Sequence, residues 1–327
     1  MKVMIGPPPL MKLEGDHLKL LRQAGFDPIF PDKPKQMLEE DILRQMKDIK
    51  ASLAGSEPYS RRVLEQLPRL KIIARCGVGW DAVDTDAATE RGIVVTIAAG
   101  TNQDAVAEHT FMLMLALAKK LIVQHTRLQK GEWPRNANLP LRGSTLGLIG
   151  LGRIGKAVAL RGKAFGMKVI AFDPVPDSAF VQAQNIELLS LDEVMQQADW
   201  ISLHLPAFAQ THHLINRAKL ALMKPTAFLI NTARGAVVEE TALFEALRDK
   251  KIAGAGLDVF EKEPPGGENP ILHLENVVAT AHTAGVDQKS RDDMARAAAQ
   301  AIVRIAAGEW PTEWIVNPEV KAKFSWN

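Results

Sequence analysis

The sequence predicts an α/β protein built from two doubly wound domains, each with a parallel sheet. Short apolar runs alternate with segments of helical spacing, which is typical of parallel sheets covered by helices. The alternation runs twice, before and after a polar loop that ends at Gly143. The chain of 327 residues is also about twice the length of an average domain, so we expect two cores.

The first series of apolar runs predicts five strands, at residues 3–5, 28–30, 51–54, 72–74 and 93–96. Between them, residues 17–24 and 59–67 repeat apolar side chains every three or four positions, which predicts amphipathic helices. One long helical pattern follows at about residues 102–128. Its apolar run, residues 111–118, is shorter than the ~20 residues that a bilayer requires. We expect it to be buried, at a domain junction or at a subunit interface.

The second series predicts six strands, at residues 146–149, 168–172, 200–205, 227–230, 253–257 and 277–280. A further helix at residues 287–307 is charged on one face and is stopped by Gly308 and Pro311. Its pattern does not tell whether this helix joins the second sheet or returns to the first.

Charge and cysteine content restrict the partners and the compartment. The chain has 40 Lys and Arg against 38 Asp and Glu, and it has no long run of one sign, so we expect a small molecule as partner rather than a nucleic acid or a membrane. The single cysteine, Cys76, cannot form an internal disulfide, and MKVMIGPPPL does not resemble a secretory leader. Both observations indicate a reducing cytoplasm.

The motif GLGRIG, residues 150–155, predicts a dinucleotide site because it follows an expected strand and opens an expected helix. Gly150 allows a tight turn, Gly152 lets the backbone approach a pyrophosphate, and Gly155 lets helix and strand pack closely. The helix N-terminus offers free amides to the phosphates. Asp173 ends the next strand, where a carboxylate accepts hydrogen bonds from ribose hydroxyls and repels a 2′-phosphate. No cation follows it in residues 174–176, so the motif favours NAD over NADP.

Three ionisable side chains, Arg234, Glu263 and His282, fall in loops beyond expected strands. Each alone has a structural explanation, as a helix cap, a solvated charge or a buried histidine. Together they suit hydride transfer to a ketone: His282 protonates the oxygen, Glu263 orients the imidazole, and Arg234 binds a carboxylate or polarises the carbonyl. The set predicts an oxidoreductase with an acidic substrate.

The remaining reactive side chains indicate no second chemistry. His212 and His213 have no partner ligands at metal-site spacing, so no metal is expected. Cys76 has no base beside it in the sequence, and we expect a small buried side chain rather than a nucleophile. His109 and His125 lie on the long helical pattern, where we expect interface or surface residues.

The ordered motifs resemble those of the D-isomer-specific 2-hydroxyacid dehydrogenase family. Besides GLGRIG with Asp173, they are RCGVGWDAVD (75–84), GTNQDAVAEH (100–109), HLP (204–206), NTARGAVVEE (231–240), GLDVFEKEP (256–264) and AHTAG (281–285). The resemblance covers nearly the whole chain and is strongest to the short phosphoglycerate-dehydrogenase-like branch. It implies an NAD-dependent enzyme that interconverts a D-2-hydroxy acid and its 2-oxo acid.

The resemblance also implies which residues form the site. Its catalytic residues are Arg234, Glu263 and His282, with His282 as the proton donor. Backbone amides of Val78 and Gly79, with Arg234, would hold the substrate carboxylate, and Asp258 would contact the nicotinamide amide. The cofactor-binding residues it implies are Gly150, Gly152, Arg153, Ile154, Gly155, Asp173, His204, Pro206, Thr232, Ala233, Asp258, His282 and Gly285.

The architecture implied by the resemblance is an insertion. A Rossmann NAD-binding domain of residues 100–285 interrupts a flavodoxin-like substrate domain, or lid, formed by residues 1–99 and 286–327. The resemblance also implies a homodimer built on the NAD-binding domain, in agreement with the apolar helix at residues 111–118.

The substrate and two rival functions stay open. Phosphoglycerate dehydrogenases of this family tend to carry arginine in the loop after the third strand, whereas this chain has Glu57, which would repel a phosphate and disfavours 3-phosphoglycerate. Arg61 and Arg62 follow, but we expect them to be solvated. The same fold occurs in NAD-sensing corepressors and in formate- or phosphite-type dehydrogenases. Measurable turnover would distinguish an enzyme from a corepressor. The formate-type alternative is disfavoured because formate oxidation does not require the Glu263 and His282 pair.

Overall fold

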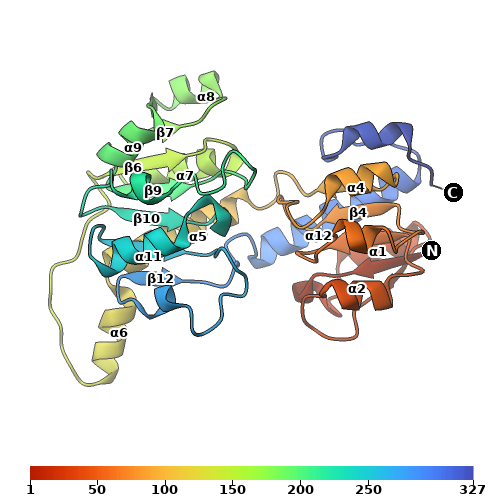
Figure 1. Ribbon diagram of the computed structural model, residues 1–327, viewed down its shortest axis with the longest axis horizontal. Helices are drawn as coiled ribbons and strands as arrows, with labels where there is room; N and C mark the ends of the chain where they lie inside the picture. The colour runs from red at the N-terminus through yellow and green to blue at the C-terminus, as the bar shows by residue number, and fades with distance from the viewer. Residues whose placement is uncertain (327) are drawn as a thin grey trace. The chain divides into compact units, whose positions relative to one another are not determined.

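The computed structural model describes residues 1–326, which form two compact units. One unit comprises Met1–Asn102 together with the segment from Val286 onward, and the other comprises Gln103–Gly285. Each unit has one parallel sheet between helices, so the predicted fold class of two doubly wound α/β domains is confirmed (Figure 1).

The discontinuous unit contains a five-stranded sheet in the order β2-β1-β3-β4-β5. This is the flavodoxin-like order. The strands are parallel, but the order in which the chain adds them to the sheet reverses between β1 and β3. Its strands are β1 (Lys2–Ile5), β2 (Asp27–Ile29), β3 (Ala51–Ala54), β4 (Ile72–Arg75) and β5 (Val94–Ile97). Its helices are α1 (Asp16–Gln23), α2 (Glu39–Gln45), α3 (Arg61–Leu64), α4 (Thr85–Glu90) and α12 (Gln288–Ala306), with 3-10 turns at Pro8–Leu10 and Pro318–Ala322.

Helix α12 returns to the first sheet, which the sequence pattern left undecided. It packs along α1 and over β3 and β4 (Figure 1). Its buried face is rich in alanine, and Ala295, Ala298 and Ala299 join Val3 and Leu53 in one core. Small side chains let the helix approach the sheet closely, so this face is complementary to the apolar strands.

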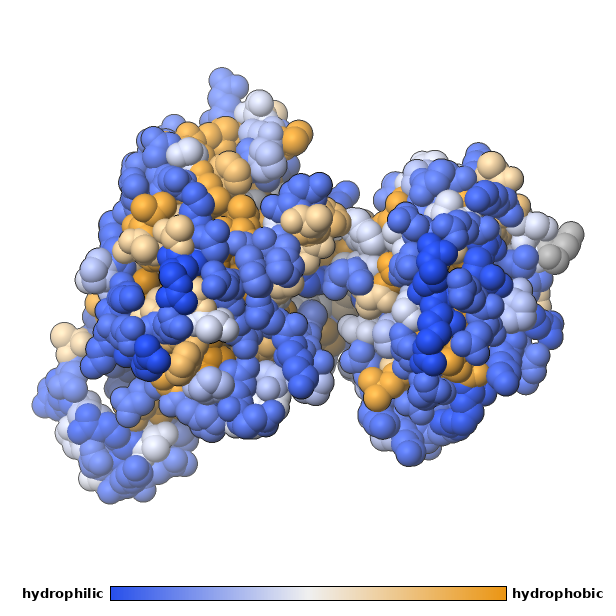
Figure 2. Space-filling model, in the orientation of Figure 1, coloured by the Kyte–Doolittle hydropathy of each residue, from blue (hydrophilic) through white to orange (hydrophobic). Residues whose placement is uncertain are grey.

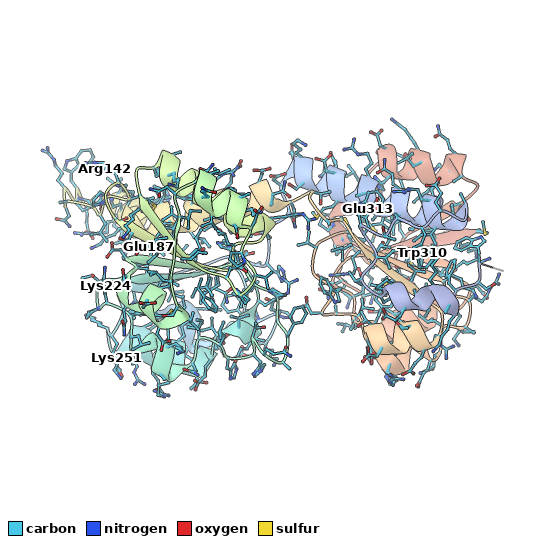
Figure 3. The ribbon with its side chains drawn as sticks, turned by 90° about the horizontal axis from the view of Figure 1, so that it is seen from above. Arg142, Glu187, Lys224, Lys251, Trp310 and Glu313 are labelled. Atoms are coloured by element: carbon cyan, nitrogen blue, oxygen red, sulfur yellow. The ribbon has the colours of Figure 1, made fainter. Side chains whose placement is uncertain are left out.

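The segment after α12 extends the same unit. Ile315 forms an antiparallel bridge to Thr96, and the buried Asn317 accepts a hydrogen bond from the Val95 amide at 2.9 Å. Figure 3 labels Trp310 and Glu313 in this segment; Trp310 packs edge-on against Phe324, and Glu313 pairs with Arg304 at 3.1 Å.

The continuous unit contains a seven-stranded sheet in the order β12-β11-β10-β9-β6-β7-β8. The order in which the chain adds strands to this sheet reverses between β6 and β9. Its strands are β6 (Thr145–Ile149), β7 (Lys168–Phe172), β8 (Glu187–Leu188), β9 (Trp200–Leu203), β10 (Phe228–Asn231), β11 (Gly254–Leu257) and β12 (Val277–Ala279). The sequence predicted six of them. It missed β8 because that edge strand has two residues, both exposed, and so lacks a buried apolar run.

Helices cover both faces of this sheet, each over its own apolar core. They are α5 (Gln103–Ala118), α6 (Leu121–Gln129), α7 (Arg153–Ala164), α8 (Ser178–Ala183), α9 (Leu191–Gln197), α10 (Arg217–Leu220) and α11 (Glu240–Arg248), with 3-10 turns at Gly235–Val237 and Pro270–His273. The prediction of one helix at residues 102–128 is wrong. Lys120 adopts a left-handed conformation with φ of 49° and separates the buried α5 from α6, which has no buried residue.

The surface agrees with the balanced composition. Figure 2 shows that the visible face of each unit is mostly hydrophilic, with hydrophobic residues in separate patches. Within residues 1–326, no helix combines the length and the apolar character needed to cross a membrane.

Candidate active site

The residues predicted to bind the cofactor lie at the carboxyl edge of the seven-stranded sheet. The strands are all parallel, so the loops that follow them meet at one edge, where open α/β sheets bind ligands. Gly150, Gly152, Arg153, Ile154 and Gly155 follow β6, Asp173 follows β7, His204 and Pro206 follow β9, Thr232 and Ala233 follow β10, Asp258 follows β11, and His282 and Gly285 follow β12.

The three glycines of the β6–α7 loop have different surroundings. Gly150 has a φ of 96°, and a Cβ there would lie 2.3 Å from the carbonyl oxygen of His204; a Cβ on Gly155 would lie 2.2 Å from the carbonyl oxygen of Gly150. A Cβ on Gly152 would meet no atom within 4 Å. Gly150 and Gly155 are therefore required by packing, whereas Gly152 leaves an open cradle at the N-terminus of α7 that fits a pyrophosphate.

Asp173 and His204 border this cradle. The carboxylate of Asp173 accepts hydrogen bonds from the amides of Leu151 at 2.6 Å and Val175 at 2.8 Å, which places it beside the glycine loop, where a ribose would lie. His204 Nε2 lies 2.8 Å from Ser202 Oγ, and burial lowers the pKa of His204 to about 3. Its buried Nδ1 has no hydrogen-bond partner within residues 1–326. A neutral imidazole with one free polar atom suits contact with a ligand.

The catalytic pair that the sequence predicted is in contact. His282 Nδ1 lies 2.7 Å from Glu263 Oε2, and the Phe260 amide donates to Glu263 Oε1 at 3.0 Å. Burial opposes ionisation of Glu263, but the hydrogen bond and charge of His282, the Phe260 amide and the charge of Arg234 together hold the pKa of Glu263 below its ordinary value. An ionised carboxylate only accepts hydrogen bonds, so Nδ1 of His282 carries a hydrogen and Nε2 faces away from Glu263.

Arg234 is brought to this pair by the turn after β10. Asn231 accepts from the Ala233 amide at 3.0 Å and donates to the Arg234 carbonyl at 2.9 Å, which fixes the turn. A Cβ on Gly235 would lie 1.9 Å from the backbone of Phe260, so only glycine allows the β10 loop to approach the loop that carries Glu263. Asn231 has no ionisable group that would single it out in the sequence, and its only signal is its place at the end of a buried strand within the NTARG motif.

Asp258 and His109 support the loop after β12. The side chain of Asp258 is 1% exposed, and its carboxylate accepts from the amides of Thr283 at 2.9 Å and Ala284 at 2.8 Å. His109, expected at an interface or on the surface, is instead mostly buried and contacts Thr280 at 2.8 Å. The sequence could not show this contact, because 171 residues separate the two partners.

Two of the three residues predicted to hold the substrate carboxylate, Val78 and Gly79, belong to the discontinuous unit. Val78 and Gly79 lie in the loop after β4, and Arg75 Nε donates to the Gly79 carbonyl at 2.9 Å. Arg61 and Arg62 are exposed and paired with glutamates of the same unit, in agreement with the expectation of solvated side chains.

Glu57, which was expected to repel a phosphate, lies in the interior of the discontinuous unit. Its carboxyl group is fully buried at the reversal point of the five-stranded sheet, against Gly6 and Gly55, and neither oxygen has a hydrogen-bond partner within the described residues. Burial raises the pKa of Glu57 in spite of the nearby charge of Arg75, so ionisation of this carboxyl group is disfavoured.

The surroundings of Cys76 disfavour a nucleophile. Burial raises the pKa of the Cys76 thiol to about 12, which disfavours the nucleophilic thiolate. Among residues 1–326, no group of three or more His, Cys, Asp or Glu side chains is placed to hold a metal ion. His213 instead pairs with Glu261.

The sequence of this chain is similar to a known domain family and to several named proteins. The profile of the D-isomer specific 2-hydroxyacid dehydrogenase, NAD binding domain, matches residues 111–284. A D-3-phosphoglycerate dehydrogenase of Methanocaldococcus jannaschii is 38% identical over 312 residues; the match covers 94% of this chain but only 59% of that longer relative. A glyoxylate reductase of Korarchaeum cryptofilum is 37% identical, and the match covers 85% of this chain and 86% of that protein.

A solved structure agrees in both units. The D-lactate dehydrogenase of Aquifex aeolicus, complexed with NAD and lactic acid, superimposes with a TM-score of 0.87 at 30% sequence identity. The alignment covers 97% of this chain and 99% of that chain, so the likeness includes the discontinuous unit as well as the continuous one.

Proposed function

Because the chain belongs to the D-isomer-specific 2-hydroxyacid dehydrogenase family, we propose that it interconverts a D-2-hydroxy acid and its 2-oxo acid with NAD as the redox partner. The observation that carries the proposal is the contact of His282 with an ionised Glu263 beside Arg234, at the same sheet edge as the glycine loop. The bound nicotinamide supplies or accepts the hydride.

In this proposal His282 moves the proton. Its Nδ1–H is held by Glu263, so Nε2 is left to donate a proton to the oxygen of the 2-oxo acid or to accept one from the hydroxy acid. The carboxylate of Glu263 stabilises the imidazolium form and fixes the orientation of the ring. Arg234 binds the carboxylate or polarises the carbonyl.

The nucleotide would bind along the carboxyl edge of the seven-stranded sheet. The cradle at Gly152 and the N-terminus of α7 fit the pyrophosphate, and Asp173 fits the ribose hydroxyls. With its carboxylate beside the loop, Asp173 would repel a 2′-phosphate, which supports NAD over NADP. His204, Pro206, Thr232, Ala233 and Gly285 would complete the lining.

Two rival functions are not favoured. The relatives described above are named as reductases and dehydrogenases of hydroxy acids, not as corepressors. An acid and base pair such as Glu263 and His282 also serves no step of formate oxidation, which leaves no alkoxide to protonate. We place the reaction in the cytoplasm, because the single cysteine, Cys76, cannot form an internal disulfide.

The test is the oxidation of NADH, followed by its absorbance, with glyoxylate, hydroxypyruvate, pyruvate, phosphohydroxypyruvate and sugar-derived 2-oxo acids. We expect turnover with at least one of them, and a higher kcat/KM with NADH than with NADPH. His282→Ala and Arg234→Ala should each lower kcat by about 10²–10⁴-fold, because each removes a group that acts on the reacting atoms.

Binding of NADH should persist in both variants, which separates lost chemistry from lost cofactor. His273→Ala is the matched control, because this histidine is exposed on the 3-10 turn Pro270–His273. Full activity of His282→Ala, or the absence of turnover with the whole panel, would contradict the proposed function.

A further inference from the structure

A chain of hydrogen bonds joins α5 to the loop that carries His282. His109, on α5, lies with Nε2 2.8 Å from Thr280 Oγ1, and the Thr280 hydroxyl donates to Asp258 Oδ1 at 2.6 Å. His109 Nε2 is also 3.5 Å from the same carboxylate oxygen. All three side chains belong to the continuous unit.

The single proton of a hydroxyl group assigns the donors along this chain. Because the Thr280 hydroxyl gives its proton to Asp258, its oxygen can only accept from His109. His109 therefore carries a hydrogen on Nε2. An apolar residue at position 109 would fill the space but would leave the Thr280 oxygen without a donor.

Asp258 transmits this contact to the catalytic loop through both its side chain and its backbone. The carboxylate accepts from the amides of Thr283 and Ala284, and the Asp258 carbonyl accepts from the His282 amide at 2.8 Å. The loop needs such support, since His282 adopts a left-handed backbone conformation with φ of 53°, which is unfavourable for a residue other than glycine.

We propose that His109 is a positioning residue of the active site. Through Thr280 and Asp258 it holds residues 282–284 in the conformation that presents His282 to the nicotinamide end of the cofactor. The proposal rests on the function proposed above. It concerns the nicotinamide end alone, because the glycine loop and Asp173, which would hold the adenosine and pyrophosphate parts, are not connected to His109 by any of these hydrogen bonds.

The test compares His109→Leu, which removes the donor, with His109→Gln, whose amide can still donate, and with His273→Leu as the exposed control. Three quantities are measured: kcat with the best 2-oxo acid, the Kd values of NADH and of ADP-ribose, and Tm. ADP-ribose lacks the nicotinamide, so it reports only on the other half of the site.

We expect His109→Leu to lower kcat by about 10- to 100-fold, since a small displacement of a catalytic group has effects of this size. The Kd of NADH should rise while the Kd of ADP-ribose stays within about twofold, and His109→Gln should recover most of both losses. His273→Leu should match the wild type.

Two outcomes would overturn the proposal. One is an unchanged kcat and an unchanged ratio of the two Kd values in His109→Leu. The other is an equal weakening of NADH and ADP-ribose with a lower Tm, which would indicate general structural support. If the wild type turned over none of the panel, the proposed function would fail, but the ratio of the two Kd values would still decide the role of His109.

Discussion

Two glutamates of this chain show how the surroundings of a carboxyl group decide its charge. Glu263 has a histidine, a backbone amide and an arginine around it, and its pKa is lowered in spite of partial burial. Glu57 is buried without a hydrogen-bond donor among the described residues, and its pKa is raised. The sequence shows both only as acidic residues in loops, so it cannot tell that their surroundings shift the two pKa values in opposite directions.

Glu57→Gln should therefore change the pH dependence of stability. In the unfolded chain the carboxyl group ionises near pH 4.5, whereas its pKa in the folded protein is raised by burial, so wild-type stability falls as the pH rises between these two pKa values by at most ~1.4 kcal/mol per pH unit. The isosteric amide does not titrate. The free energy of unfolding of the Glu57→Gln protein, minus that of the wild type, should grow in urea denaturation as the pH rises above the unfolded-state pKa.

If the free energies of unfolding of the two proteins changed in the same way with pH, the raised pKa of Glu57 in the folded protein would be refuted. The burial of Glu57 also bears on the substrate. A carboxyl group that is buried and disfavoured from ionising is a poor source of repulsion for a phosphate, so the choice between 3-phosphohydroxypyruvate and acids without a phosphate falls to the panel of substrates rather than to this residue.

At the level of helices and strands, prediction succeeded where a local pattern carries the information. Most strands are buried apolar runs, and the motif residues at their carboxyl ends were placed at the predicted edge. The exposed strand β8 and the break at Lys120 have no such signal. The packing of α12 on the first sheet and the contact of His109 with Thr280 both join residues far apart in the chain, so no local pattern could reveal them.

The β6–α7 loop allows binding and folding to be separated by two substitutions of the same kind. Gly152→Ala places a methyl group in open space at a φ of −69° that alanine accepts, so Tm should stay near that of the wild type while the Kd of NADH rises about tenfold or more. Gly155→Ala drives its methyl group into the Gly150 carbonyl and should lower Tm or prevent folding.

Thermal unfolding with calorimetric titration of NADH decides this prediction. Equal losses of Tm in the two variants would show that Gly152 is a packing residue. Unchanged NADH binding by a folded Gly152→Ala protein would show that the pyrophosphate does not approach this loop.

At the level of the whole molecule, α6 and the loop after it carry large apolar side chains that are exposed. Helix α6 extends away from the sheet of its unit (Figure 1), and Leu121, Ile122, Leu128 and Trp133 are all exposed, Trp133 by 78%. A succession of large exposed side chains is unusual in a monomer and marks an interface. We propose that a second copy of the chain covers this surface.

Sedimentation or light scattering should accordingly give twice the mass of 35.8 kDa. Ile122→Glu should shift the protein toward monomer, because a buried charge without a partner opposes association. Leu188→Glu, on the exposed edge strand β8, should leave the mass unchanged. A monomeric wild type, or an Ile122→Glu protein with undiminished mass, would contradict this interface.

The insertion of one unit into the other has a consequence for synthesis on the ribosome. Strands β1 to β5 emerge first, but α12, which covers β3 and β4 and buries Leu53 and Ile72 in a shared core, is translated only after Gly285. Residues 103–285, by contrast, leave the exit tunnel as one uninterrupted stretch that contains its whole sheet. The nucleotide-binding unit is thus able to fold before α12 has been translated. Until then, part of the apolar surface of the first sheet is accessible to chaperones.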